Sequence, residues 1–288
     1  AFKTGLFNIG TPGQFIIGAF AAVYVGVKWT FLPGSIHWLV AILAAFAAGG
    51  LWAVIPGVMK AYLNVNEVIS SIMMNYIGMY LVNYSVSLVL FDALRNQSLP
   101  VATTAVIPKM GFDKIFTGSP ANGGFVIAIL FVILIYIILN KTSFGYEMKA
   151  CGFNKDASKY AGINEKRNII LSMVIAGALA GVGGGLLYLS GSGKFIEVVD
   201  VLPAEGFNGI PVALLGLSNP IGVLFAGLFI AYLNVGGNAM QQFGFIPQIV
   251  DIIISCIIYC SALSLMIKVW LSKRRKTKEL GTAKKEGE

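Results

Sequence analysis

The chain has 288 residues, of which 57% are hydrophobic and 12% are charged. Soluble domains carry about a quarter charged residues, so an ordinary soluble domain is excluded, and the long apolar runs lack the alternation of a membrane β-barrel. The net charge of +8 does not indicate nucleic-acid binding, because most of the excess lies in residues 141–168 and after Lys268, as in cytoplasmic segments of membrane proteins. The sequence predicts an all-α, polytopic membrane helical bundle of about eight segments, each of ~20 residues.

The first predicted span, residues 5–27, is broken close to its start by the stretch NIGTPG at residues 8–13. Backbone groups freed by such a break are tolerated in a membrane only where they are buried in protein or line a cavity. Broken helices are frequent at substrate sites of transporters, so Asn8 and Gln14, which flank the break, are candidate substrate-pathway residues. The alternative is a frayed end, because the chain begins in mid-element without an initiator Met and we expect an N-terminal piece to be missing.

The second span is predicted at residues 35–59, and the third, at residues 67–91, carries a polar stripe. Its members are spaced three or four residues apart and share one helix face: Glu67, Ser71, Asn75 and Gly78. Polar residues inside a membrane usually face a bundle interior or a water-filled path, so Glu67, Ser71 and Asn75 are further pathway candidates. The alternative is a stripe of interhelical hydrogen bonds that only holds helices together, with Glu67 an anchor at the helix end.

A polar loop at residues 92–122 and a fourth span at 124–140 precede the charged segment at residues 141–168. This segment holds six of the 21 Lys and Arg residues. Within it a short helix is predicted from Asn154, which can cap the helix, to Ile163, with Gly162 marking the end. It is either a solvated connector or a docking helix for a soluble partner, and we favour the docking helix.

The remaining predicted spans lie at residues 169–190, 206–217, 221–236 and 245–267. The first of these is rich in small residues, which lets helices approach closely, and the second is too short to cross alone. Asn208, in the motif GFNG, is another candidate pathway residue. Residues 1–270 then form the transmembrane domain, and residues 271–288 form a basic tail that we expect to be disordered. Counting segments places residue 1, the charged loop and the C-terminus in the cytoplasm, with residues 191–205 outside.

No catalytic group set, metal-ligand set or cofactor motif is found in the sequence. The stretch SGSGKF at residues 190–195 resembles a phosphate loop, but Phe195 stands where a Ser or Thr should follow Lys194. We therefore expect no bound cofactor or metal and no ATP site in this chain.

Four blocks of sequence resemble the permease subunits of bacterial nucleoside ABC importers, within the branched-chain amino acid and simple-sugar permease family. They are FKTGLFNIGTPGQ (2–14), NEVISSIMMNYIGMYLVNY (66–84), GFNKDASKYAGI (152–163) and GFNGIPVALLGLSNPIG (206–222). The resemblance implies the ABC importer permease fold, a second permease subunit, a separate ABC ATPase subunit and a substrate-binding lipoprotein. It also implies that the third block couples to the ATPase, through Gly152, Asn154, Ala157, Tyr160, Ala161 and Gly162.

The sequence is thus interpreted as a multi-pass permease of the bacterial cell membrane that moves nucleosides by alternating access and is not itself an enzyme. A simple-sugar importer, for example of a pentose, is the nearest alternative. A secondary transporter or channel is a more distant alternative, because only Glu67 and Asp251 could serve as intramembrane coupling groups. An intramembrane enzyme is weaker still.

Overall fold

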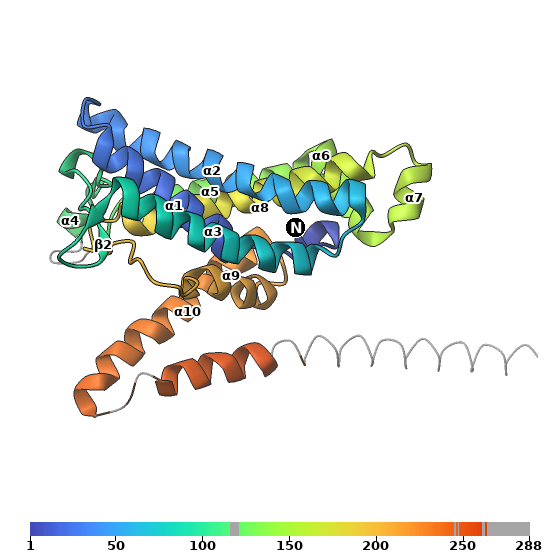
Figure 1. Ribbon diagram of the computed structural model, residues 1–288. Helices are drawn as coiled ribbons and strands as arrows, with labels where there is room; N and C mark the ends of the chain where they lie inside the picture. The colour runs from blue at the N-terminus through green and yellow to red at the C-terminus, as the bar shows by residue number, and fades with distance from the viewer. Residues whose placement is uncertain (116–120, 245, 247, 261–262, 264–288) are drawn as a thin grey trace, which may run out of the picture. The chain divides into compact units, whose positions relative to one another are not determined.

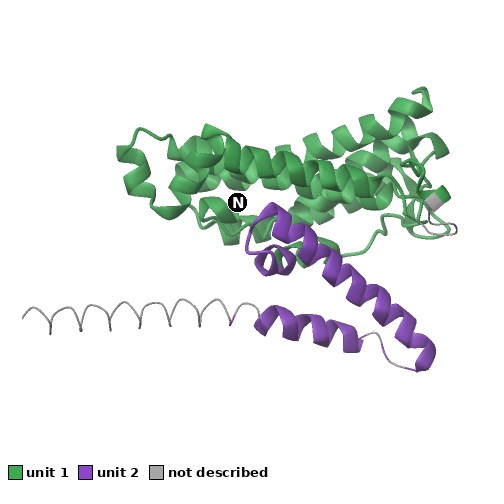
Figure 2. Cartoon of the chain, turned by 180° about the vertical axis from the view of Figure 1, so that it is seen from behind, with its two compact units in different colours: residues 1–210 green, residues 211–288 purple. Residues whose placement is uncertain are grey.

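The structure is a computed structural model that describes residues 1–115, 121–244, 246, 248–260 and 263. The chain divides into two compact units, Ala1–Ile210 and Pro211–Glu288 (Figure 2). Each unit is described by itself below. The predicted tail, residues 271–288, lies outside the described residues.

The first unit is a bundle of long helices that run side by side (Figure 1). After the short 3₁₀ helix η1 (Phe2–Thr4), its long helices are α1 (Thr11–Lys28), α2 (Gly34–Leu63), α3 (Glu67–Val89), α5 (Gly124–Lys141) and α8 (Glu165–Tyr188). Helices α1, α2 and α8 form its centre, α3 packs on α1, and Phe131 of α5 stacks on Phe46 of α2 with ring centroids 6.3 Å apart.

The central helices touch backbone to backbone through glycines. A Cβ on Gly18 of α1 would collide with the Cα of Gly181 in α8, and one on Gly49 of α2 would collide with the carbonyl oxygen of Gly177. Small residues allow this approach, and van der Waals contact then replaces the hydrophobic drive that lipid does not provide. The close packing predicted from the small residues of 169–190 is confirmed.

The connections gather at the two ends of this bundle. At one end lie β1 (Phe91–Asp92), β2 (Gln97–Ser98), η2 (Thr103–Ala105) and α4 (Phe112–Ile115); at the other lie η1, α6 (Ser143–Phe153) and α7 (Lys155–Tyr160) (Figure 1). The antiparallel pair β1–β2 departs from the expected all-α fold. It forms because Arg95 N donates to Asp92 O at 3.3 Å and Asn96 adopts a left-handed φ of 52°, which closes a tight turn.

The second unit contains α10 (Pro220–Met240), η3 (Gln241–Phe243) and an apolar helix at Gln248–Cys260. Helix α9 (Ala204–Leu215) contains the boundary between the units. At the start of α10, Asn219 caps the helix, accepting a hydrogen bond from Ile221 N at 3.1 Å, and Pro220 occupies its first turn.

Five described helices are long and apolar enough to cross a membrane: α2, α3, α5, α8 and the segment Pro220–Phe243. The chain is therefore a helical, multi-pass membrane protein. The other three predicted segments correspond to α1, which includes Gln14 and Lys28, to the shorter α9, and to Gln248–Cys260. The total of about eight segments thus stays a prediction.

Candidate functional site: a buried polar turn and an exposed loop

The predicted break in the first span is a buried turn between η1 and α1. Asn8, 6% exposed, accepts a hydrogen bond from Gly10 N at 2.9 Å, and its Nδ2 donates to Gln14 Oε1 at 3.0 Å. Pro12 lies in the first turn of α1, where its missing N–H leaves no helical hydrogen bond unmade. The turn therefore satisfies many of its own polar groups inside the bundle, as a broken helix in a membrane must.

Helix α3 supplies the remaining partners of this turn through Asn75. Its Oδ1 accepts from Gly13 N at 2.9 Å and its Nδ2 donates to Ile9 O at 2.9 Å. Asn75 and Gln14 are each 1% exposed. The structure thus brings three predicted pathway residues, Asn8, Gln14 and Asn75, into one hydrogen-bonded group, which is called the polar turn below.

The other predicted pathway residues lie at different distances from the polar turn. Ser71 is fully buried. It lies beside the polar turn, since a Cβ on Gly10 would be 3.3 Å from the Ser71 Cβ. Its Oγ has no hydrogen-bond partner among the described residues. Glu67 instead begins α3 and pairs with Lys60 at 2.8 Å. Asn208 is exposed, although Gly206, two residues earlier in α9, packs its backbone against Pro12.

Helix α7 has the predicted end signals. Asn154 caps it, accepting a hydrogen bond from Ala157 N at 3.1 Å. At its other end Gly162 is left-handed, with a φ of 79°, and Ile163 N donates to Ser158 O at 3.1 Å, the pattern of a Schellman cap. The predicted short helix between Asn154 and Ile163 is confirmed as α7.

All six predicted coupling residues are exposed: Gly152, Asn154, Ala157, Tyr160, Ala161 and Gly162. Tyr160 is 94% exposed. Exposed aromatic side chains are favoured anchors of protein interfaces.

Phe153, at the end of α6, is also 90% exposed and was not among the predicted residues. The signal that could have found it is an aromatic residue inside a charged segment, within the motif GFN.

Gly152 is also exposed, but its backbone additionally packs against the chain's own first helix, η1. A Cβ at this position would collide with the carbonyl oxygen of Lys3 in η1. In return, a Cβ on Gly5 would touch the Gly152 carbonyl oxygen at 3.4 Å. This contact places residue 1 and the charged loop at the same end of the bundle, as the count of segments predicted.

Polar contacts fasten the loop to the bundle around α7. Asn168 Nδ2 of α8 donates to Glu147 Oε2 of α6 at 3.0 Å, and Lys155 of α7 lies 3.8 Å from Glu165 of α8. The ammonium of Lys166 lies over the Tyr62 ring, 4.6 Å from its centroid. These contacts join α7 and α6 to α8, and α8 to α2.

The family model described as branched-chain amino acid transport system / permease component matches residues 1–262. The chain belongs to this family. Among curated relatives, the guanosine ABC transporter permease NupP of Bacillus subtilis is 39% identical over 96% of this chain and 79% of its own length. The nucleoside ABC transporter permease NupB of Lactococcus lactis is 36% identical over 100% and 80%.

A third relative, the glucose ABC transporter permease TsgB13 of Haloferax volcanii, is 32% identical over 89% of this chain and 69% of its own length. No solved structure shows significant similarity to the chain. The relatives named here are all permeases of ABC transporters, which agrees with the membrane helices of the structure.

Proposed function

We propose that this chain is a transmembrane permease subunit of an ATP-driven importer that carries nucleosides into the bacterial cell by alternating access. The observation that carries the proposal is the capped, exposed helix α7 at one end of a membrane bundle, in a chain of the ABC permease family. A separate ATPase subunit would bind α7, with Phe153 and Tyr160 as aromatic anchors of the interface.

The contact between Gly152 and Lys3 gives the coupling a physical route. Helix α6 ends at Phe153, one residue before the cap of α7, and its Gly152 packs on η1. Residues 5–10 then lead directly from η1 into the polar turn. A shift of α7 on ATP binding would move η1 and strain the hydrogen bonds between Asn75 and the backbone of Ile9 and Gly13. The pathway role of Asn8, Gln14, Ser71 and Asn75 rests on this arrangement.

The proposed substrate rests on the two most similar relatives named above, which are named for guanosine and for nucleosides. Because a glucose permease is also among the relatives, a simple sugar is the second candidate for the substrate. A nucleoside contains a pentose, so the two candidates share the ribose hydroxyls and differ in the flat base.

The proposed assembly contains this chain, a second permease subunit, an ABC ATPase and a substrate-binding lipoprotein. Exposed apolar side chains along α3, such as Ile69, Tyr76 and Leu88, give a membrane-embedded surface that lipid or a second permease would cover. The C-terminus and α7 would lie in the cytoplasm.

Coupling and substrate are tested together by uptake of labelled guanosine into cells that express the complete importer. Ala161→Glu adds a charge at the exposed C-cap of α7, whereas Ala93→Glu makes the same change on the exposed turn at the other end of the bundle. We expect Ala161→Glu to lower uptake and substrate-stimulated ATP hydrolysis at least tenfold, and Ala93→Glu to leave both unchanged, with equal amounts of either variant in the membrane.

Excess uridine or adenosine should compete with the labelled guanosine, whereas ribose and glucose should not. Normal ATP hydrolysis and uptake in Ala161→Glu would contradict the coupling role of α7. Competition by free sugars alone would replace the nucleoside with a simple sugar as the substrate.

A further inference from the structure

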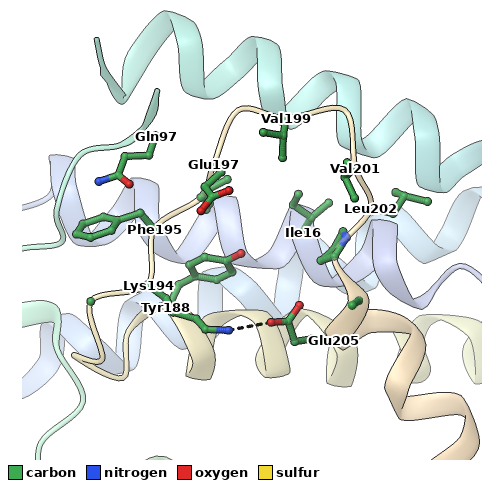
Figure 3. A pocket seen from close by; sticks show the side chains of 14 residues that line it. Ile16, Gln97, Tyr188, Lys194, Phe195, Glu197, Val199, Val201, Leu202 and Glu205 are labelled. Carbon is green, nitrogen blue, oxygen red and sulfur yellow. Dashed lines mark hydrogen bonds and ion pairs between the residues drawn. The ribbon is translucent and has the colours of Figure 1, made fainter. Parts of the chain in front are cut away.

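The first unit contains a cavity of about 450 Å³ near the end of the bundle opposite α7. Its walls come from α1, β2, the end of α8 and the segment that leads from α8 into α9 (Figure 3). Sites for small molecules usually have volumes of about 300–1,000 Å³, so the cavity is large enough for a nucleoside or a sugar.

Hydrogen bonds hold the segment at residues 193–205, which lines much of the cavity, in place. Ser98 N donates to Ile196 O at 2.8 Å and Val198 N donates to Asn96 O at 3.1 Å, which extends the β1–β2 pair by backbone contacts. Asn83 Nδ2 of α3 donates to Val199 O at 3.0 Å. The cavity is therefore a fixed feature of the first unit.

An ion pair closes one side of the cavity. Lys194 Nζ donates to Glu205 Oε1 at 2.9 Å (Figure 3). Burial alone would raise the pKa of the Glu205 carboxyl, but the hydrogen bonds from Lys194 and from its own backbone bring that pKa below its ordinary value. Glu205 is thus ionised at neutral pH, and the pair joins the two ends of the enclosing segment.

The lining combines apolar side chains with a few charged ones, as sites for small molecules do. The Tyr188 ring, with Ile16 and Leu202, offers apolar and aromatic surface suited to a flat ring. Glu197, in contrast, makes no ion pair or side-chain hydrogen bond within the described residues, and Figure 3 shows its carboxylate on the wall near Tyr188. A free carboxylate accepts strong hydrogen bonds from sugar hydroxyls.

The wall of the cavity is connected through the chain to the polar turn, although Asn8, Gln14 and Asn75 do not line the cavity. Ile16 on its wall follows Gln14 by two residues, and Glu205 immediately precedes Gly206, whose backbone packs on Pro12. A movement of the polar turn along the proposed coupling route would therefore reach the cavity wall through Ile16 and Glu205.

We propose that this cavity binds an uncharged nucleoside on its way to the polar turn, with the base on Tyr188 and the ribose hydroxyls on Glu197. This inference rests on the proposed function. The charged side chains of the lining, Lys194, Glu197 and Glu205, sum to one negative charge, which disfavours nucleotides because their phosphates are anionic.

The test uses the complete importer in proteoliposomes and measures the rate of guanosine uptake against guanosine concentration. Glu197→Gln removes the carboxylate, and Tyr188→Leu removes the aromatic ring while Tyr188→Phe retains it. The matched control is Asp200→Asn on the same segment, because Asp200 does not line the cavity and the new amide can still accept the hydrogen bond from Asn83.

We expect Glu197→Gln and Tyr188→Leu to lower the ratio of maximal rate to half-saturating concentration at least tenfold. Tyr188→Phe should lower this ratio less than Tyr188→Leu does, and Asp200→Asn should stay within about twofold of the parent. Equal protein amounts and equal thermal unfolding temperatures in the membrane fraction would exclude misfolding. A photoreactive azidoguanosine should label the peptide that contains residues 188–205 in the parent and in Asp200→Asn.

If the parent takes up guanosine while Glu197→Gln and Tyr188→Leu match Asp200→Asn, the cavity is not a binding station and the proposed function still stands. Labelling confined to other peptides would likewise contradict nucleoside binding in the cavity. If the parent takes up no nucleoside, the proposed function itself fails.

Discussion

The side-chain amide of Asn75 joins α3 to Gly13 at the start of α1, 62 residues earlier in the sequence. Replacing it with Leu leaves the buried N–H of Gly13 without its acceptor and the carbonyl of Ile9 without its donor. An unsatisfied buried group of this kind costs about 1–3 kcal/mol. We therefore expect Asn75→Leu to lower guanosine uptake at least tenfold and to reduce the thermal stability of the purified permease by several degrees.

Asn83→Leu is the matched control for this change, since it lies on the same helix and also removes side-chain hydrogen bonds. Its partners, Val199 O and Asp200 Oδ1, belong to exposed residues, so water can replace them. We expect a smaller loss of stability for Asn83→Leu. Full uptake by Asn75→Leu, with unchanged stability, would show that the amide neither supports the turn nor serves the pathway.

At the scale of elements, the centre of the first unit depends on which glycine faces which helix. A Cβ on Gly181 of α8 would collide with the carbonyl oxygen of Ala45 in α2, whereas one on Gly183 would meet only the Phe15 ring at 3.8 Å, an ordinary contact. Both positions would gain up to about 1 kcal/mol of helix propensity from Ala. We expect Gly181→Ala to lower the unfolding temperature in detergent and Gly183→Ala to leave it unchanged or raise it.

Comparing Gly181→Ala with Gly183→Ala separates the effect of helix packing from that of helix propensity, because the same substitution is made two residues apart on one helix. Equal unfolding temperatures for the two variants would mean that α2 and α8 can separate without cost. Such a result would contradict the backbone contact at Ala45 as a source of stability.

The sequence predicts elements well where the signal is local. Asn154 and Gly162 mark the two ends of α7 because capping and left-handed backbone depend on neighbouring residues. The break before α1 follows from Pro12 and its flanking glycines for the same reason. The β1–β2 pair escaped prediction because two-residue strands carry too short an alternation to be recognised.

Contacts between distant segments could not be predicted from the sequence. The polar stripe on α3 is visible as a pattern, but only the packing of α3 on α1 shows that Asn75 meets the turn while Glu67 pairs with Lys60. Gly152 fitted a coupling motif, yet its backbone contact with Lys3 depends on where η1 folds. The cavity beside Tyr188 likewise draws its lining from four separate stretches of chain.

At the scale of the whole molecule, the two ends of the first unit differ in charge. Residues 141–168, which include α7, have six Lys or Arg and three acidic residues, whereas residues 191–205 have one Lys and three acidic residues. Basic loops remain in the cytoplasm during insertion. We therefore expect α7 to face the cytoplasm and the cavity to open toward the outside of the cell.

This orientation can be measured with a membrane-impermeant maleimide on cells that express single-cysteine variants. With Cys151, Cys256 and Cys260 replaced by Ala, a cysteine at Ala93 should react in intact cells, and one at Ala161 should react only after permeabilisation. Both positions are exposed in the first unit, at opposite ends of its bundle, so a difference in labelling reports the side of the membrane rather than burial. A cysteine at Gly281 should follow Ala161 if the C-terminus is cytoplasmic. Reaction at Ala161 in intact cells would invert the permease and place α7 beyond the reach of a cytoplasmic ATPase.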